Sequence, residues 1–141
     1  MPQPADLLPS SRILVVDDNA ANLTLAAVVL EASGCQVLTA DSAEQAQSLL
    51  ITLVPDLILM DVALPGMDGL TLTRLLKADK RLQHVPVIAL TAFAMDGDEF
   101  KALQAGCDGY IAKPIDTRAL PAQIERVLQQ AARRREEKAG D

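Results

Sequence analysis

A chain of 141 residues, of which 50% are hydrophobic and 2% aromatic, is long enough for one domain with an aliphatic core. Its formal net charge of −6 excludes a sequence-independent nucleic-acid binder, which needs a basic face. No apolar run approaches the ~20 residues of a membrane span, and the first residues lack the pattern of a signal peptide. Cys35 and Cys107 have no metal-ligand spacing, so we expect both to be buried and reduced in a cytoplasmic protein.

Short apolar runs alternate along the chain with segments of helical pattern. The runs predict strands at residues 12–16, 36–40, 56–60, 86–90 and 109–112. The segments after them predict helices at residues 20–33, 43–53, 70–78, 96–106 and from 117 to about 131. Gly34 stands where a left-handed residue would end the first helix, and Asp41 or Ser42 suits the N-cap of the second.

Two of these helices differ in the apolar faces that they offer to the sheet. The helix after the third strand should bury Leu72, Leu75 and Leu76. The helix after the fourth strand has a thin apolar face, made of Phe100, Leu103 and small alanines. Because a thin face anchors a helix weakly, this helix is a candidate moving part.

Strands that are apolar throughout and separated by helices form parallel sheets covered on both faces. The chain therefore predicts an α/β fold, a doubly wound five-stranded parallel sheet of flavodoxin-like order 2-1-3-4-5 with helices on both faces. We expect a flexible N-terminal arm at residues 1–10, one domain at residues 11–130 and a charged helix end or tail at residues 131–141.

Basic side chains form no face of their own in this sequence. The cluster at residues 133–135 is followed at once by two glutamates, so we expect a solvated helix end. Arg74 and Lys77 should lie on the exposed face of their helix and contribute only solubility. His84 has no clustered partner and should be a surface residue.

Polar side chains follow four of the predicted strands. Asp17 and Asp18 follow the first strand, Asp61 the third, Thr91 the fourth and Lys113 the fifth. The carboxyl ends of parallel strands meet at one edge of a sheet, so these side chains should lie close together. The acidic pair alone would also suit a turn or a helix N-cap, but in register with the others it predicts a site.

Three carboxylates at one edge repel one another and need a compensating charge. Oxygen ligands without a suitable histidine or cysteine favour Mg²⁺, with Mn²⁺ as a substitute. A metal, a hydroxyl and an ammonium around one small space favour phosphoryl transfer. Asp61 stands alone at the tip of a central strand, so it is the best candidate for a carboxylate nucleophile.

In these motifs the chain resembles a receiver domain of the two-component response-regulator superfamily, from Arg12 to about Leu128. The resemblance is strongest to stand-alone receivers of the DivK kind, and receivers of hybrid histidine kinases look nearly the same. The matching segments are Val15 to Asn19, Leu59 to Asp61, Leu64 to Gly69, Ala89 to Met95, Gly106-Cys107 and Tyr110 to Ile115.

The resemblance implies a role for each residue of the acidic edge. Asp61 would take a phosphoryl group from a phosphohistidine on a kinase or phosphotransfer protein. Asp18, Asp61 and the backbone carbonyl of Ala63 would ligate Mg²⁺, and Asp17 would hold it mainly through water. Lys113 would pair with Asp61 and then with the phosphoryl oxygens. The protein would be no enzyme beyond catalysing its own phosphorylation and dephosphorylation.

The resemblance also implies a switch. Pro114 would follow a cis peptide bond that aims Lys113 into the site. Thr91 would swing toward the phosphoryl group, and Tyr110 would turn into the vacated space. The fourth helix, fifth strand and fifth helix would then present a changed surface to a downstream protein, to another carrier of a phosphorelay or to a second copy in a weak dimer.

Residues two positions beyond Asp61 and Thr91 predict slow self-dephosphorylation. Ala63 offers no polar side chain to orient an attacking water, and Phe93 is bulky and apolar. We expect a phosphoryl lifetime longer than seconds in the isolated protein.

Two other classes of function compete with a phosphorylated receiver. An aspartate-nucleophile phosphohydrolase would need an acid-base Asp two residues after its nucleophile, but Asn19 and Ala63 stand at those positions. A pseudo-receiver that only docks would not need the full acidic set, Thr91 and Lys113. Because no effector domain follows, we expect protein contacts rather than direct DNA binding as the output.

Overall fold

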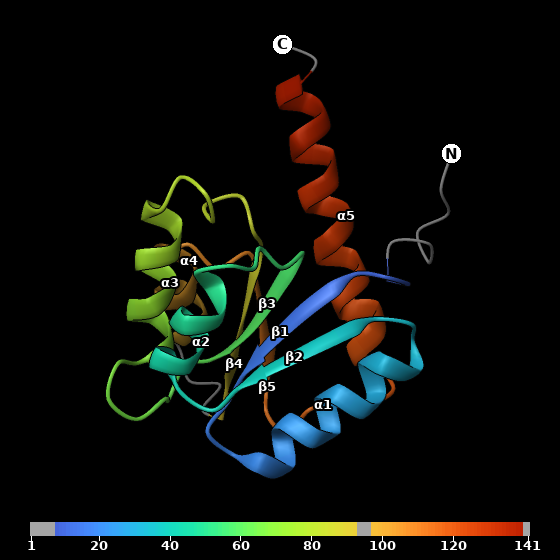
Figure 1. Cartoon of the computed structure of the whole chain (residues 1–141), viewed down its shortest axis with the longest axis vertical. Coiled ribbons are helices and arrows are strands. Elements are labelled where there is room, and N and C mark those ends of the chain that lie inside the picture. The colour runs from blue at the N-terminus through green and yellow to red at the C-terminus, as the bar shows by residue number, and fades with distance from the viewer. Residues whose placement is uncertain (1–7, 93–96, 140–141) are drawn as a thin grey trace.

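The computed structural model describes residues 8–92 and 97–139. They form a five-stranded parallel sheet in the order β2-β1-β3-β4-β5, which confirms the predicted α/β fold (Figure 1). The strands are β1 (Arg12–Val16), β2 (Gln36–Ala40), β3 (Leu57–Asp61), β4 (Val87–Thr91) and β5 (Gly109–Ala112). The helices are α1 (Ala20–Ala32), α2 (Ala43–Leu50), α3 (Gly69–Ala78), α4 (Asp98–Ala105) and α5 (Leu120–Ala139).

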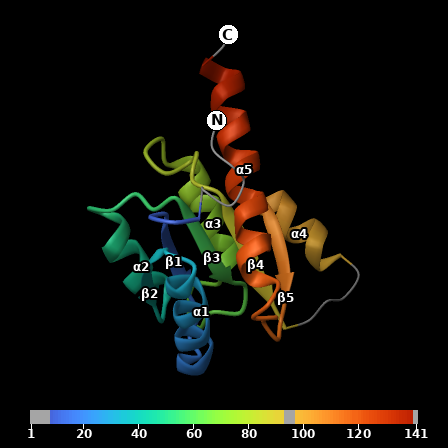
Figure 2. The same cartoon turned by 90° about the vertical axis from the view of Figure 1, so that its right-hand side faces the viewer.

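The sheet separates two apolar cores. Leu14 and Val16 face the core covered by α2, α3 and α4, whereas Ile13 and Val15 face the core covered by α1 and α5 (Figure 2). All five residues of β3 and of β4 are buried, as the continuous apolar runs predicted. Both cysteines are buried and free.

The predicted faces of two helices are partly wrong. Leu75 on α3 is 47% exposed, and Phe100 and Leu103 on α4 are 62% and 54% exposed. The α4 helix instead buries Ala102 and Ala105, whose small side chains let it lie close to the sheet. Phe100 and Leu103 therefore point to solvent, and α4 presents an apolar outer face.

Several element ends differ from the predicted ones by a few residues. The α2 helix ends at Leu50 rather than Leu53, and β3 begins one residue late and includes Asp61. Ser42 is the N-cap of α2, where its hydroxyl accepts a hydrogen bond from the backbone N–H of Gln45 at 3.1 Å. Among the described residues no helix combines the length and the hydropathy of a membrane span.

The first described residues pack at the amino edge of the sheet, which is the edge where the strands begin. The last helix extends beyond that edge. Leu8 is buried, and the backbone N–H of Ser10 donates to the carbonyl of Gly34 at 2.8 Å. The last three residues of the expected arm, residues 8–10, thus contact the domain. The α5 helix continues past the sheet to Ala139 as a projecting helix (Figure 1), and it buries Leu120, Ile124, Val127, Leu128 and Ala131.

Candidate functional site

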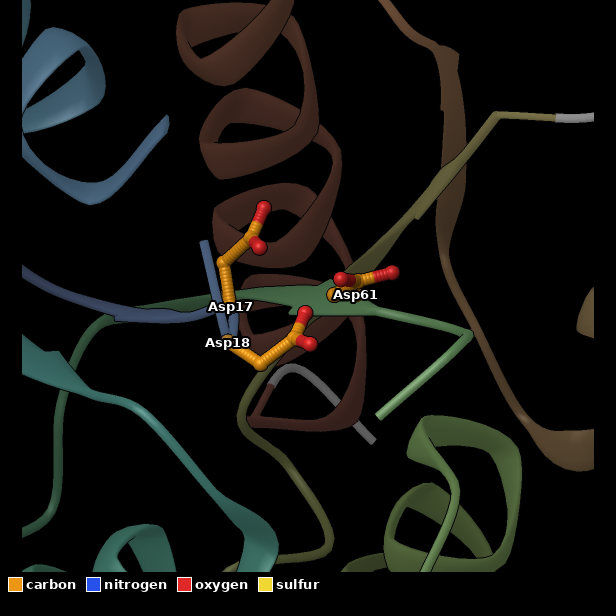
Figure 3. Close-up of side chains that lie close together, drawn as sticks. All are labelled: Asp17, Asp18 and Asp61. Atoms are coloured by element: carbon orange, nitrogen blue, oxygen red, sulfur yellow. The ribbon is translucent and has the colours of Figure 1, made fainter. Parts of the chain in front are cut away.

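The polar side chains predicted to meet do so at the carboxyl edge of the sheet. Asp17 and Asp18 follow β1, Asp61 ends β3, Thr91 ends β4 and Lys113 follows β5. Asp17, Asp18 and Asp61 each offer a carboxylate oxygen, and these oxygens lie within 4.8 Å of one another (Figure 3). Strands β1 and β3 are neighbours, so strand order alone places the three carboxylates together.

Asp17 is an anchored carboxylate rather than a helix cap. Its side chain is fully buried, and Oδ1 accepts a hydrogen bond from the backbone N–H of Asn19 at 2.9 Å. Oδ2 accepts from Nδ2 of Asn22 at 3.2 Å. The N-cap of α1 is Asn19, whose Oδ1 accepts the backbone N–H of Asn22 at 3.1 Å. The alternative that the acidic pair caps the helix is therefore wrong, because Asn19 is the N-cap of α1.

Asp61 is almost as deeply buried, with 2% of its surface exposed. Its Oδ1 accepts a hydrogen bond from the backbone N–H of Ala63 at 3.0 Å. Its Oδ2 lies 3.1 Å from Nζ of Lys113. The carboxylate is thus held in one orientation at the end of a rigid central strand.

Lys113 is the cation of this edge, and it serves two carboxylates. Its Nζ lies 3.2 Å from Oδ2 of Asp17 as well as 3.1 Å from Oδ2 of Asp61. Burial alone would lower the pKa of Lys113, but the hydrogen bonds to Asp61 and Asp17 outweigh it and raise the pKa. The backbone N–H of Lys113 donates to the carbonyl of Thr91 at 2.7 Å. The Lys113–Pro114 peptide bond is cis, as the resemblance implies.

The edge carries more negative charge than its lysine can neutralise. Asp18 is exposed, and within the described residues its carboxylate has no hydrogen bond or ion pair. Three carboxylates therefore lie at distances where like charges repel, and Lys113 pairs with only two of them. An all-oxygen set of this size fits Mg²⁺, which takes one or two carboxylates and keeps several waters.

Gly69 shapes the site, although the sequence marked it only as part of a loop. A Cβ atom on Gly69 would lie 2.1 Å from the backbone oxygen of Asp61. The backbone N–H of Gly69 donates to the carbonyl of Val62 at 3.1 Å. Any larger residue would push the start of α3 away from Asp61, so glycine is required by this close approach.

The remaining predicted site residues lie around this cluster. Thr91 is 7% exposed, and Tyr110 is half-buried on β5 against the core that α2, α3 and α4 cover. Ala63 is exposed beside Asp61. Phe93, on which part of the lifetime prediction depends, lies outside the described residues.

A second charged cluster, at the opposite edge of the sheet, was missed. Asp108 precedes β5, and its Oδ2 accepts from the backbone N–H of Val87 at 2.9 Å and from Nζ of Lys77 at 3.0 Å. Its Oδ1 accepts from Nη1 of Arg134 at 3.0 Å. The prediction that Lys77 contributes only solubility is therefore wrong. The arginine cluster is exposed, as predicted, but Arg134 also makes an ion pair. The partners come from distant segments, so no local pattern marks them.

The chain belongs to the response regulator receiver domain family, whose sequence profile matches residues 13–125. The sheet order described above is that of the CheY-like fold. The chain is 45% identical over 115 residues to the polar-differentiation response regulator DivK of Brucella ovis, a match that covers 82% of this chain and 91% of DivK.

Solved structures agree with this assignment. The signal receiver domain of a signal transduction histidine kinase from Syntrophus aciditrophicus is 33% identical, with a TM-score of 0.79 over 86% of this chain and 92% of that one. A CheY-like response regulator receiver domain protein from Methanospirillum hungatei is 32% identical, with a TM-score of 0.80 over 89% and 98% of the two chains. The chain therefore resembles receivers along most of its length.

Proposed function

We propose that this chain is a single-domain response regulator that accepts a phosphoryl group on Asp61 from a phosphohistidine of a histidine kinase or phosphotransfer protein. A carboxylate oxygen of Asp61 attacks the phosphorus atom, and the P–O bond forms as the P–N bond breaks. The electron pair of the P–N bond stays on the leaving imidazole, which takes up a proton. The burial of Asp61 beside two further carboxylates and Lys113, in a chain of this family, is the observation that carries the proposal.

The neighbouring groups prepare Asp61 for this reaction. Asp18, Asp61 and the backbone carbonyl of Ala63 would hold Mg²⁺, with Asp17 contacting it through water. The bound ion would neutralise charge on the transferring phosphoryl oxygens. Lys113 holds Asp61 in position and remains close enough to pair with the phosphoryl group afterwards. Its second ion pair, with Asp17, fixes the ammonium between β1 and β3.

The output would be a change of protein contacts on α4, β5 and α5. Thr91 ends the strand beside β5, so a hydroxyl drawn toward the phosphoryl group would leave space that Tyr110 can enter. Phe100 and Leu103 form an exposed apolar face on α4, which suits a protein partner. Ala63 offers no polar side chain to orient water, so we expect the phosphoryl group to persist beyond seconds. We expect this signalling in the cytoplasm, where the free thiols stay reduced.

Intact mass after incubation with acetyl phosphate and Mg²⁺ tests the proposal. The parent protein should gain one phosphoryl group, and Asp61→Asn should gain none. Asp41→Asn is the matched control, because Asp41 is an exposed acid that follows β2 at the same edge. No gain in the folded parent would favour a pseudo-receiver, and a gain in Asp61→Asn would place the acceptor elsewhere.

A further inference from the structure

A cavity of about 360 Å³ lies at the amino edge of the sheet, opposite the acidic cluster. Its walls come from the segment between α3 and β4 and from the last turns of α5. Pro86 and Ala131 supply an apolar part of the lining, while His84, Arg134 and Arg135 supply polar groups. Its volume is at the lower end of the range of small-molecule sites, about 300–1,000 Å³.

Asp108 fixes the charged wall of this cavity. Its carboxylate pairs with Lys77 and Arg134 at 3.0 Å each. Lys77 is fully engaged, because its Nζ also donates to the carbonyl of Val85 at 2.8 Å. Nη1 of Arg134 donates a hydrogen bond to Asp108, and the side chain of Arg134 is 57% exposed. The ion pair therefore orients this guanidinium group and leaves its other N–H donors for a ligand.

Two side chains of the cavity have free hydrogen-bond donors. Within the described residues, Arg135 and His84 have no hydrogen bond or ion pair, and both are exposed. Lys77, Arg134 and Arg135 outnumber the two carboxylates of the lining, which are Asp108 and Glu137. The cavity thus carries net positive charge in a chain whose formal charge is −6.

We propose that this cavity is a binding site for a small phosphate-bearing molecule. Arg134 and Arg135 would hold the phosphate oxygens through guanidinium forks, which match phosphate geometry with two hydrogen bonds each. His84 would donate from the facing loop, and Pro86 and Ala131 would contact an apolar part of the ligand. The tetrahedral phosphate suits donors that converge from two segments better than a planar carboxylate does. The site is independent of phosphoryl transfer to Asp61.

Backbone amide NMR of the full chain tests this site, with inorganic phosphate and phenyl phosphate as probes. EDTA and constant ionic strength exclude metal-assisted binding at the acidic edge and general salt effects. We expect saturable shifts at the amides of Asp108 and of residues 131–135. Tighter binding of phenyl phosphate would identify a phosphate ester as the preferred ligand, and equal binding would identify free phosphate.

Arg135→Ala is the informative variant, because Arg135 lies outside the ion pairs of Asp108 and its loss should leave the fold intact. It should weaken binding by about tenfold, the loss of one charge-assisted contact. Arg133→Ala removes the same charge from the same helix outside the cavity lining, and it should bind within about twofold of the parent. Absence of saturable shifts, or an equal loss of affinity in the two variants, would overturn the proposal.

Discussion

The two edges of the sheet each hold aspartates that form ion pairs, and the two edges differ in how the negative charge is balanced. At the amino edge, the single carboxylate of Asp108 meets Lys77, Arg134 and a backbone N–H. At the carboxyl edge, three carboxylates lie together and Lys113 pairs with two of them, Asp17 and Asp61. The first arrangement satisfies its carboxylate within the fold, whereas the second leaves one carboxylate without a cation among the described residues.

This difference separates a structural cluster from a functional one more clearly than burial does. Asp17 and Asp61 are as buried as any core residue, yet their shared lysine leaves Asp18 unpaired among the described residues. Unbalanced charges lower stability, and in natural proteins such violations occur mainly at functional sites.

The largest effect should follow from Asp108→Ala at the balanced edge. The substitution leaves the Val87 N–H without its acceptor and removes the carboxylate partner of Lys77, so it should lower the free energy of unfolding by about 3 kcal/mol. Urea unfolding of parent and variant measures the loss. Asp41→Ala removes an exposed acid and should change stability by less than about 0.5 kcal/mol. Equal losses in the two variants would contradict a structural role for Asp108.

A smaller effect should appear at the same edge when pH is raised. Burial raises the pKa of Cys107 to about 11 from its ordinary value of 9.0. Below pH 9 the thiol is protonated in the folded and unfolded states alike. Between pH 9 and 11 only the unfolded thiol ionises, so folding should lose stability, by about 2 kcal/mol in all.

Cys107→Ala isolates this contribution to the pH dependence. The difference in unfolding free energy between parent and variant should stay constant up to pH 9 and then shift against the parent as pH approaches 11. Other groups that titrate in this range cancel in the difference. Parallel curves for the two proteins would show that the folded state does not keep this thiol protonated, and that the amino edge is wetter than its packing indicates.

The sequence predicted the acidic edge well because each part of it is local. A short apolar run followed at once by Asp61, Thr91 or Lys113 places that residue at the end of a strand. The parallel order of the strands then brings the ends together. No contact between distant residues had to be known beforehand.

The same sequence could not predict the amino edge, because its contacts join distant segments. Lys77 and Asp108 are 31 residues apart, and Arg134 and Asp108 are 26 apart. The fit of Gly69 against the backbone of Asp61 depends equally on tertiary packing. The exposure of Phe100 depends on which side of α4 meets the sheet, and a helix with few apolar residues does not specify that side.

The smallest effect, and the one of opposite sign, should follow from Asp18→Asn at the unbalanced edge. In EDTA the variant loses a carboxylate that repels two others, so it should be more stable than the parent by about 1 kcal/mol. At a Mg²⁺ concentration of 100 times its Kd, the parent should gain about 2.7 kcal/mol, and the variant, with a ligand missing, should gain much less. The order of stability of the two proteins in urea unfolding should therefore reverse on adding Mg²⁺.

Asp41→Asn, with the same charge change outside the cluster, should follow the parent in both buffers. A variant less stable than the parent in EDTA would mean that Asp18 has a stabilising partner, and equal gains from Mg²⁺ would mean that it is not a ligand.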